Sequence, residues 1–157
     1  MFKQLISATP TATLVAPPNW LNLEHLARVD LSSEDANHPI ESSLQTTSSS
    51  GWRAATAGTQ TIRLLFDHPQ HISRIHLYFL KTHIARTQKY ILRWSDNDGT
   101  AQREIVRQQW NFNPKGACAQ TEDYQDDLAG LRVLELCIAP DISGSDADGM
   151  LAQLRVA

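Results

Sequence analysis

The sequence predicts an all-β domain built as an antiparallel β-sandwich, and three observations support this. Large apolar residues recur at every second position in several short segments. Turn-forming residues separate these segments, and no long stretch shows the 3.6-residue period of an amphipathic helix. The chain has 157 residues, the length of one ordinary domain, and its 41% hydrophobic and 20% charged residues are typical of a globular protein.

The first part of the chain is expected to pack against the sandwich. Residues 1–28 contain scattered Pro and Thr, and we expect them to form an N-terminal extension. Residues 29–157 would then form the β-sandwich itself, giving a single domain overall. Within the extension, Asn19 is a suitable cap for a short helical turn. That turn would place three large side chains on one side: Trp20, Leu23 and Leu26.

After Gly51 the dominant period is two, as in strands with one buried face. In residues 61–66, for example, every second residue is large and apolar, and Asp67-His68-Pro69 then forms a turn. The uncharged Ser- and Thr-rich residues 42–51 indicate a loop. Residues 110–130 show no regular period and predict a long loop, which in compact domains is usually functional. The same alternation predicts further strands at residues 75–79, 90–94, 103–107, 133–138 and 151–156.

Charge and composition argue against several classes of partner. With 17 acidic and 14 basic residues the net charge is −3, so no overall positive field attracts nucleic acid. No apolar run reaches the about 18 to 20 residues of a membrane-spanning helix, and the N-terminus does not resemble a secretory signal. We therefore expect no nucleic-acid partner, no membrane association and a cytoplasmic location. Cys118 and Cys137 have no zinc-site spacing and fit reduced thiols, although a bridge between them stays open.

The sequence contains none of the short motifs that mark common catalytic or cofactor sites. It has no G-x-S-x-G elbow, no Cys-x-x-Cys, no phosphate-binding glycine loop and no dinucleotide fingerprint. Its six histidines form no ligand pair spaced along a helix, and residues 144–155 lack the ligands of an EF-hand. We therefore expect a protein that is not an enzyme and holds no metal or cofactor.

Several segments, none of them specific alone, follow one another in a characteristic order and spacing. They include Tyr90-Ile91-Leu92-Arg93-Trp94-Ser95-Asp96 with Gly99, and the closing Leu151-Ala152-Gln153-Leu154-Arg155-Val156. This order resembles the discoidin family, also called the coagulation factor V/VIII type C family, whose domains are galactose-binding-domain-like. The resemblance covers the chain from about residue 29 to the C-terminus. The other matching segments are residues 32–34, 39–44, 51–52, 60–66, 72–78 and 132–136.

This resemblance implies an eight-stranded antiparallel jelly-roll sandwich with short helical turns, whose loops at one end bind sugars, lipid headgroups or proteins. Many family members hold a structural calcium ion in a loop before the tryptophan, closed by a glutamate in the last strand. Here the corresponding loop, residues 45–51, has no carboxylate, and Gln153 stands where the family has the glutamate. Because calcium prefers several carboxylate and carbonyl oxygens, we expect that site to be absent or weak.

The most suggestive candidate for a ligand site is the segment around Trp110. Trp110 and Phe112 could supply an aromatic face for a sugar ring. Its hydroxyl groups could be hydrogen-bonded by Asn111, Asn113 and Arg86. The alternative is that the two rings only pin the long loop onto the sandwich.

Three further candidates follow from the resemblance. His83 and Arg86 lie in residues 81–88, where family members often place ligand residues, and they suit an anionic or polyhydroxylated ligand. Trp52 stands where the family places its loop tryptophan. The alternative for His83 and Arg86 is a solvated surface loop.

Two functions remain in competition. The leading hypothesis is a non-catalytic binding module that recognises a carbohydrate or glycan-like ligand through loops at one end of the sandwich. The runner-up is a protein-interaction or assembly module of a cytoplasmic, bacterial-type protein without sugar binding, with a homo-oligomer as one form of it. A hydrolytic enzyme comes third. Fold alone does not decide between these functions, because function depends on the site that the fold carries.

Overall fold

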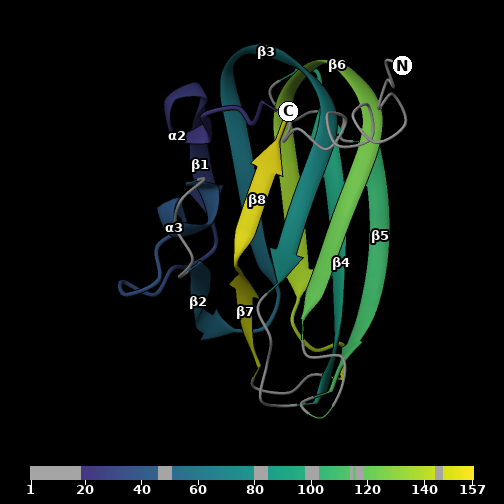
Figure 1. Cartoon of the computed structure of the whole chain (residues 1–157). Coiled ribbons are helices and arrows are strands. Elements are labelled where there is room, and N and C mark those ends of the chain that lie inside the picture. The colour runs from purple at the N-terminus through teal and green to yellow at the C-terminus, as the bar shows by residue number, and fades with distance from the viewer. Residues whose placement is uncertain are drawn as a thin grey trace, which may run out of the picture.

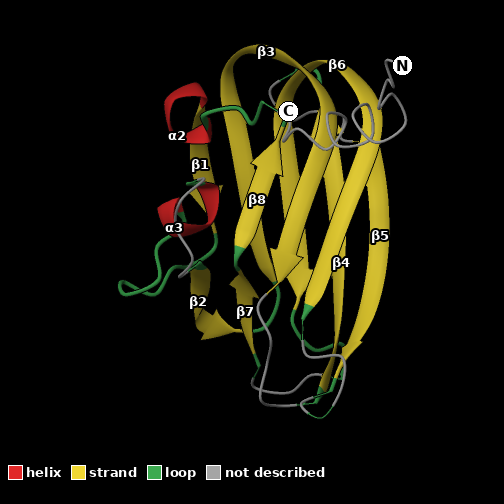
Figure 2. Ribbon diagram, in the orientation of Figure 1, coloured by secondary structure: helices red, strands yellow, loops and turns green. Residues whose placement is uncertain are grey.

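The computed structural model describes residues 19–45, 51–79, 85–97, 103–113, 115, 119–143 and 147–157. These residues form the predicted antiparallel β-sandwich with two short helical turns (Figures 1 and 2). No helix within these ranges is long and apolar enough to cross a membrane. The elements in chain order are α2 (Leu23–Leu26), β1 (Ala27–Leu31), α3 (Glu41–Leu44), β2 (Trp52–Ala57), β3 (Gln60–Phe79), β4 (Arg86–Ser95), β5 (Arg103–Phe112), β6 (Gln120–Ala139), β7 (Asp148–Leu151) and β8 (Gln153–Val156).

Two long strands, β3 and β6, pair antiparallel over most of their length and curve from one layer of the sandwich into the other (Figure 1). Residues 60–66 of β3 lie between β1 and residues 133–138 of β6, and β6 continues the layer to β4 and β5. Residues 75–78 of β3 lie between β8 and the first part of β6. Strands β2 and β7 form a separate pair.

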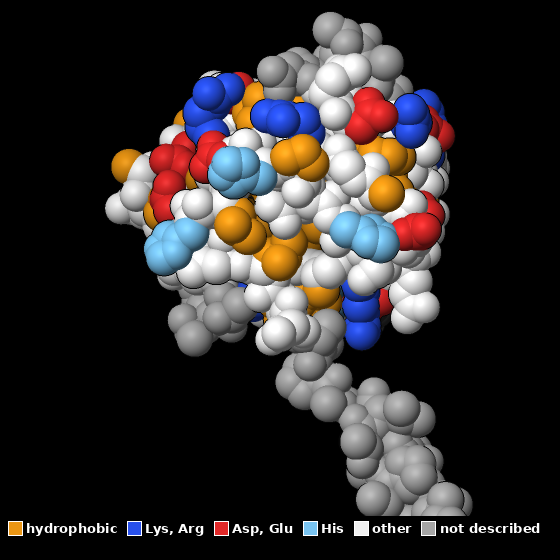
Figure 3. Space-filling model, turned by 90° about the horizontal axis from the view of Figure 1, so that it is seen from above, with side chains coloured by type: hydrophobic (Ala, Val, Ile, Leu, Met, Phe, Trp, Pro, Cys, Tyr) orange, Lys and Arg blue, Asp and Glu red, His pale blue; other side chains and the backbone are white. Residues whose placement is uncertain are grey.

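The turn predicted at Asp67-His68-Pro69 does not end the strand. The extended backbone continues through it, and the register with β6 shifts between Leu65 and Arg74. These irregularities coincide with the bend, as bulges commonly do where a strand changes direction. In the view onto this end, basic, acidic and histidine side chains are interspersed on the surface (Figure 3).

The long loop predicted at residues 110–130 is wrong for much of its length. Strand β5 extends to Phe112, and β6 begins at Gln120. The acidic run within β6 concealed the strand, because Tyr124 and Leu128 are its few large apolar residues. Pairing with β3 still holds this segment extended, so tertiary context overrides the weak local pattern.

The core consists of the inward-facing apolar residues of the two layers, together with Trp52. Trp52 is 0% exposed and donates its indole N–H to the Ser33 carbonyl, 3.1 Å away. Just before it, Gly51 has φ 71°, and a Cβ there would lie 2.8 Å from the Ala152 Cα. Only glycine allows this approach of β2 to the segment joining β7 and β8.

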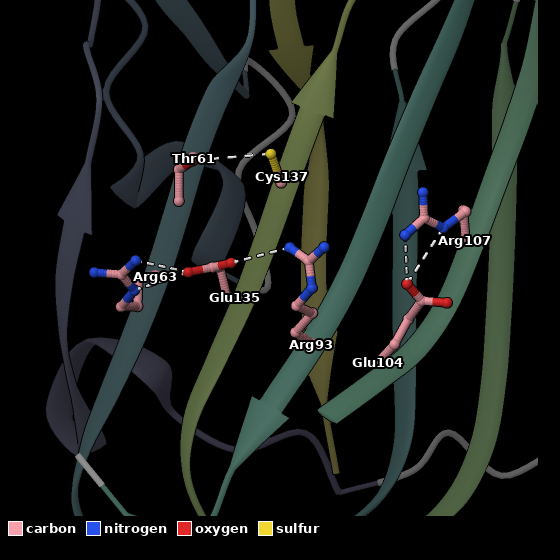
Figure 4. Close-up of polar contacts among 7 residues, drawn as sticks. All are labelled: Thr61, Arg63, Arg93, Glu104, Arg107, Glu135 and Cys137. Carbon is pink, nitrogen blue, oxygen red and sulfur yellow. Dashed lines mark hydrogen bonds and ion pairs between the residues drawn. The ribbon is translucent and has the colours of Figure 1, made fainter. Parts of the chain in front are cut away.

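The larger layer of the sandwich has the strand order β1-β3-β6-β4-β5, and a row of charged residues crosses its outer face. Its members are register partners on adjacent strands, and their charges alternate in sign. At the centre, Glu135 accepts hydrogen bonds from Arg63 and lies 3.6 Å from an Arg93 nitrogen (Figure 4). Such a row favours one register over a slipped one. From edge to edge the row is Asp30, Arg63, Glu135, Arg93 and Glu104.

The described part of the N-terminal extension contacts the sandwich. The Leu21 N–H donates to the Val156 carbonyl at 2.8 Å, and the Arg74 guanidinium lies 5.7 Å from the centre of the Trp20 ring. The predicted helical turn is present as α2, one turn long, with Asn22 rather than Asn19 at its start. Residues 1–18 lie outside the described residues, so the boundary at residue 28 stays a prediction.

Candidate functional site

A pocket of about 430 Å³ opens at the end of the sandwich where β4 begins and β5 and β6 end. This is the lower end in Figure 1, opposite the bend of β3 and β6. Three separate segments of the chain form it, so the register of β4 with β5 and β6 sets its shape. Its lining residues are Ala85, Arg86, Thr87, Asn111, Phe112, Asn113, Asp141 and Ser143.

Arg86 is the fixed cation of this pocket. Its side chain is only 8% exposed, and its guanidinium lies 5.4 Å from the centre of the Phe112 ring, its register partner on β5. It donates to the Asp148 carbonyl at 2.9 Å. Burial lowers the pKa of Arg86, while the charges of Asp141 and Asp148 oppose that shift. An arginine keeps its charge in proteins, so a rigid donor group is held at the pocket.

Two asparagines present their amide groups to the pocket in a defined orientation. The Thr87 hydroxyl donates to the Asn111 side-chain oxygen at 2.7 Å. The Lys115 backbone N–H donates to the Asn113 side-chain oxygen at 3.0 Å. Because both carbonyl oxygens already accept a hydrogen bond, the two NH₂ groups are the parts available to donate to a ligand.

The segment after β6 supplies the acceptor of the pocket. Asp141 accepts hydrogen bonds from the Ser143 backbone N–H at 3.1 Å and from its hydroxyl at 2.7 Å, which closes a tight turn. The Ile142 N–H between them donates to the Thr87 carbonyl at 2.9 Å and fixes the turn to β4. A carboxylate is therefore held beside the donors of β4 and β5.

The structure brings three of the predicted site residues together. Arg86, Asn111 and Phe112 all line the pocket, although Arg86 and Phe112 face inward and Asn111 faces outward at the strand ends. Sequence reasoning missed Asp141 as a member of this site. Only its position directly after the β6 strand and Pro140 could have indicated it, since strand ends gather at one edge of a sandwich.

The predicted aromatic face is not found among the described residues. Phe112 is 2% exposed and lies beneath Arg86. Trp110 is half-buried, is not among the lining residues and packs on the core from the inner face of β5. The ring of Trp52 is in the core, out of reach of a ligand in solvent, which corrects its expected role. His83 lies outside the described residues.

The loop at residues 45–51, where the family resemblance would place a calcium ion, lies next to a buried arginine. Residues 46–50 lie outside the described residues, but the adjacent Gln45 carbonyl accepts a hydrogen bond from Arg155 at 2.9 Å. Arg155 is 7% exposed, and a buried guanidinium opposes a second cation nearby. These residues do not fit a calcium ion. Within the described ranges no group of three His, Cys, Asp or Glu residues is placed to hold any metal.

Comparison with known proteins gives likeness in structure only. No family model matches the sequence, and no curated protein matches it. The chain is similar to the family 32 carbohydrate-binding module of Clostridium perfringens NanJ in complex with galactose. The two sequences are 14% identical. The structural match covers 87% of this chain and 96% of that domain, with a TM-score of 0.62.

Two further solved structures show the range of proteins with this fold. One is a family 32 module of a Clostridium perfringens protein in complex with GalNAc-β-1,3-galactose, at 16% identity over 88% of this chain and 99% of that one, with TM-score 0.63. The other is reduced XRCC1 bound to the DNA polymerase β catalytic domain, at 16% identity over 84% and 96%, with TM-score 0.61. The chain therefore has the galactose-binding-like β-sandwich fold of the family 32 carbohydrate-binding modules.

Proposed function

We propose that this chain is a non-catalytic carbohydrate-binding module that binds a sugar in the pocket at the end of its sandwich. The observation that carries the proposal is the grouping of oriented donors and an acceptor in that pocket: Arg86, Asn111, Asn113 and Asp141. A sugar hydroxyl both donates and accepts hydrogen bonds, so neighbouring hydroxyls are matched by a guanidinium or amide on one side and a carboxylate on the other.

The charges in the pocket favour a neutral sugar over an acidic one. Arg86 contributes the positive charge, and Asp141 and the adjacent Asp148 contribute negative charge. The carboxylate of a uronic acid would therefore meet repulsion from Asp141 and Asp148 as well as attraction to Arg86. Because no aromatic ring presents an open face among the described lining residues, hydrogen bonding rather than stacking is the main source of affinity.

The finer assignment is also part of the proposal. We assign the chain to the discoidin-like members of this fold, on the order of strand motifs in its sequence, and place it in the cytoplasm. The sugar-bound neighbours support a carbohydrate as the partner.

A glycan array with matched variants tests the proposal. Asn111→Leu removes a pocket amide from the outer face of β5, and Gln109→Leu removes an exposed amide two residues away on the same face and outside the pocket. The wild-type protein and Gln109→Leu should bind the same neutral sugars, and Asn111→Leu should lose at least tenfold in affinity, the loss of about 1.4 kcal/mol. Absence of binding to every sugar by the wild-type protein would overturn the proposal.

The second candidate is a protein-interaction or assembly module. The XRCC1 neighbour carries this fold in complex with a protein, and Ile142 is a large apolar residue with 50% exposure beside the pocket. Light scattering after size-exclusion chromatography addresses self-association directly. An Ile142-dependent dimer in a protein that binds no sugar would favour this candidate, and a strict monomer would count against the homo-oligomer.

A further inference from the structure

Buried polar atoms without a hydrogen-bond partner are concentrated at the pocket end of the sandwich. Among the described residues, eight side-chain nitrogen or oxygen atoms are fully buried and unpartnered. Five of them belong to this end: Arg86 Nε, Gln88 Nε2, Gln88 Oε1, Trp110 Nε1 and Gln120 Oε1. Buried polar groups in folded proteins nearly always have a partner, so a cluster of exceptions in one place calls for an explanation.

These atoms come from neighbouring positions inside the sandwich. Gln88 and Trp110 are register partners on β4 and β5, and both side chains face inward. Gln120 faces inward from the opposite layer, where it is the register partner of Phe79. The Phe79 ring packs 5.1 Å from the ring of Tyr90, two residues along β4 from Gln88. All three unpartnered side chains therefore face the interior at the pocket end of the sandwich.

This region differs from the rest of the interior. Between β3 and the second half of β6, the inward-facing residues are aliphatic or aromatic. Between β4, β5 and the first half of β6, polar residues such as Gln88, Gln120 and Glu122 lie among the apolar ones. Several of these polar residues are paired, since the Tyr90 and Tyr124 hydroxyls are hydrogen-bonded and Gln120 Nε2 donates to Glu122 at 3.2 Å. The unpartnered atoms are the part of this polar region that the described side chains leave unsatisfied.

A wrong amide orientation does not explain every member of the cluster. The side-chain nitrogen and oxygen of Gln88 could be exchanged without loss of a hydrogen bond. Exchanging them in Gln120 would break its hydrogen bond to Glu122. Trp110 Nε1 is always a donor. The side chains of Gln88 and Gln120 are 1% and 2% exposed, so bulk water does not reach these atoms freely.

We propose that Gln88, Trp110 and Gln120 form an internal binding site for hydroxyl groups, separate from the end pocket. Gln88 Nε2 and Trp110 Nε1 are donors, and Gln88 Oε1 and Gln120 Oε1 are acceptors. A hydroxyl group or a water molecule satisfies both kinds at once, whereas an anion or a cation satisfies only one. The guest is an ordered water molecule, and the site exists whether or not the end pocket binds a sugar.

Stability measurements separate a filled site from an empty one. Gln88→Met keeps the size of the side chain and removes its amide. If a guest is bound, the variant loses real hydrogen bonds, and the unfolding equilibrium constant should rise about 5- to 30-fold. If Gln88 has no partner, removing its buried amide should instead stabilise the protein, which would overturn the proposal.

Gln60→Met is the matched control for this substitution. Gln60 is equally buried, at 2% exposure, and its amide accepts from Ser33 at 2.7 Å and donates to Thr56. Its loss of stability shows what the removal of satisfied amide bonds costs in this chain. Trp110→Phe, which removes only one donor, should couple with Gln88→Met in a double-mutant cycle if both atoms bind the same guest. Strict additivity of the stability changes of the two substitutions would count against a shared guest.

A crystal structure of the wild-type protein gives the second readout and identifies the guest. Density within about 3.2 Å of Gln88 and Trp110 in crystals grown without any sugar or polyol supports the proposal with ordered water as the guest. An empty site in these crystals overturns it.

Discussion

Arg63 and Glu135 form a two-pronged hydrogen bond across neighbouring strands at the centre of the larger layer. The Arg63 Nε and Nη2 atoms lie 3.0 and 2.7 Å from one carboxylate oxygen of Glu135, which is 6% exposed (Figure 4). Arg93 approaches the other oxygen from β4. The nearly buried carboxylate therefore joins three strands whose register also positions the end pocket.

Replacing Glu135 by Ala should destabilise the fold. The substitution leaves two guanidinium groups without their carboxylate, but both arginines are partly exposed, so water offsets part of the loss. We expect the free energy of unfolding to fall by about 2 kcal/mol, measured by urea denaturation. Glu104→Ala, at the exposed end of the same row, should leave the unfolding midpoint nearly unchanged. Equal effects of the two variants would show that burial of Glu135 is not what matters.

Calcium should have no effect on the stability of this protein. Arg155 already bonds the carbonyl at the start of the loop where related domains would bind the ion. The midpoint of thermal unfolding should be the same in excess calcium chloride and in EDTA. Arg155→Met should lower that midpoint in both solutions, because the Gln45 carbonyl loses a charged donor. A rise of several degrees with calcium in the wild-type protein would contradict the account.

The tyrosine pair inside the sandwich should make the fold sensitive to alkaline pH. Burial, followed by the hydrogen bond to Tyr124, raises the pKa of Tyr90, and burial also raises the pKa of Tyr124. A raised pKa in the folded state contributes stability below the unfolded pKa of about 10, and that stability is lost as the pH rises above it. The wild-type protein should therefore lose more unfolding free energy between pH 9 and pH 11 than Tyr90→Phe does. Parallel losses in the two proteins would refute this.

The charge of Asp141 should set a preference for neutral sugars. At low ionic strength the wild-type protein should bind galactose several-fold more tightly than galacturonic acid, as measured by isothermal titration calorimetry. Asp141→Asn keeps the oxygen that accepts a hydrogen bond from Ser143 and removes the negative charge. It should therefore reduce the difference in affinity between galactose and galacturonic acid. Asp126→Asn, on exposed β6, serves as the control. Tighter binding of the uronic acid by the wild-type protein would contradict the proposed role of Asp141.

The sequence predicted the layers of this fold better than the contents of its site. Alternation in residues such as Ile62, Leu64 and Phe66 reports burial of one strand face directly, and these residues are in the core. The first half of β6 was missed because its stability comes from pairing with β3 rather than from its own composition.

The site depended on contacts that no local pattern encodes. Arg86 and Phe112 were predicted, but their pairing across β4 and β5 is a consequence of register. The sequence predicts a loop at Trp110, whereas β5 extends to Phe112 and places Trp110 on its inner face. Asp141 joins the pocket through the Ile142 backbone bond to Thr87, a tertiary contact between residues 55 positions apart in the sequence.

The most direct test of the central claim is to map sugar binding by NMR on the ¹⁵N-labelled protein. Titration with the neutral sugars that bind on the array should shift the amide signals of β4 residues 86–87, β5 residues 111–113 and residues 141–143, which surround the pocket. The same titration with Asn111→Leu should need at least tenfold more sugar to produce the same shifts. Shifts confined to other surfaces, or none at saturating sugar, would contradict the assignment of the pocket as the carbohydrate site.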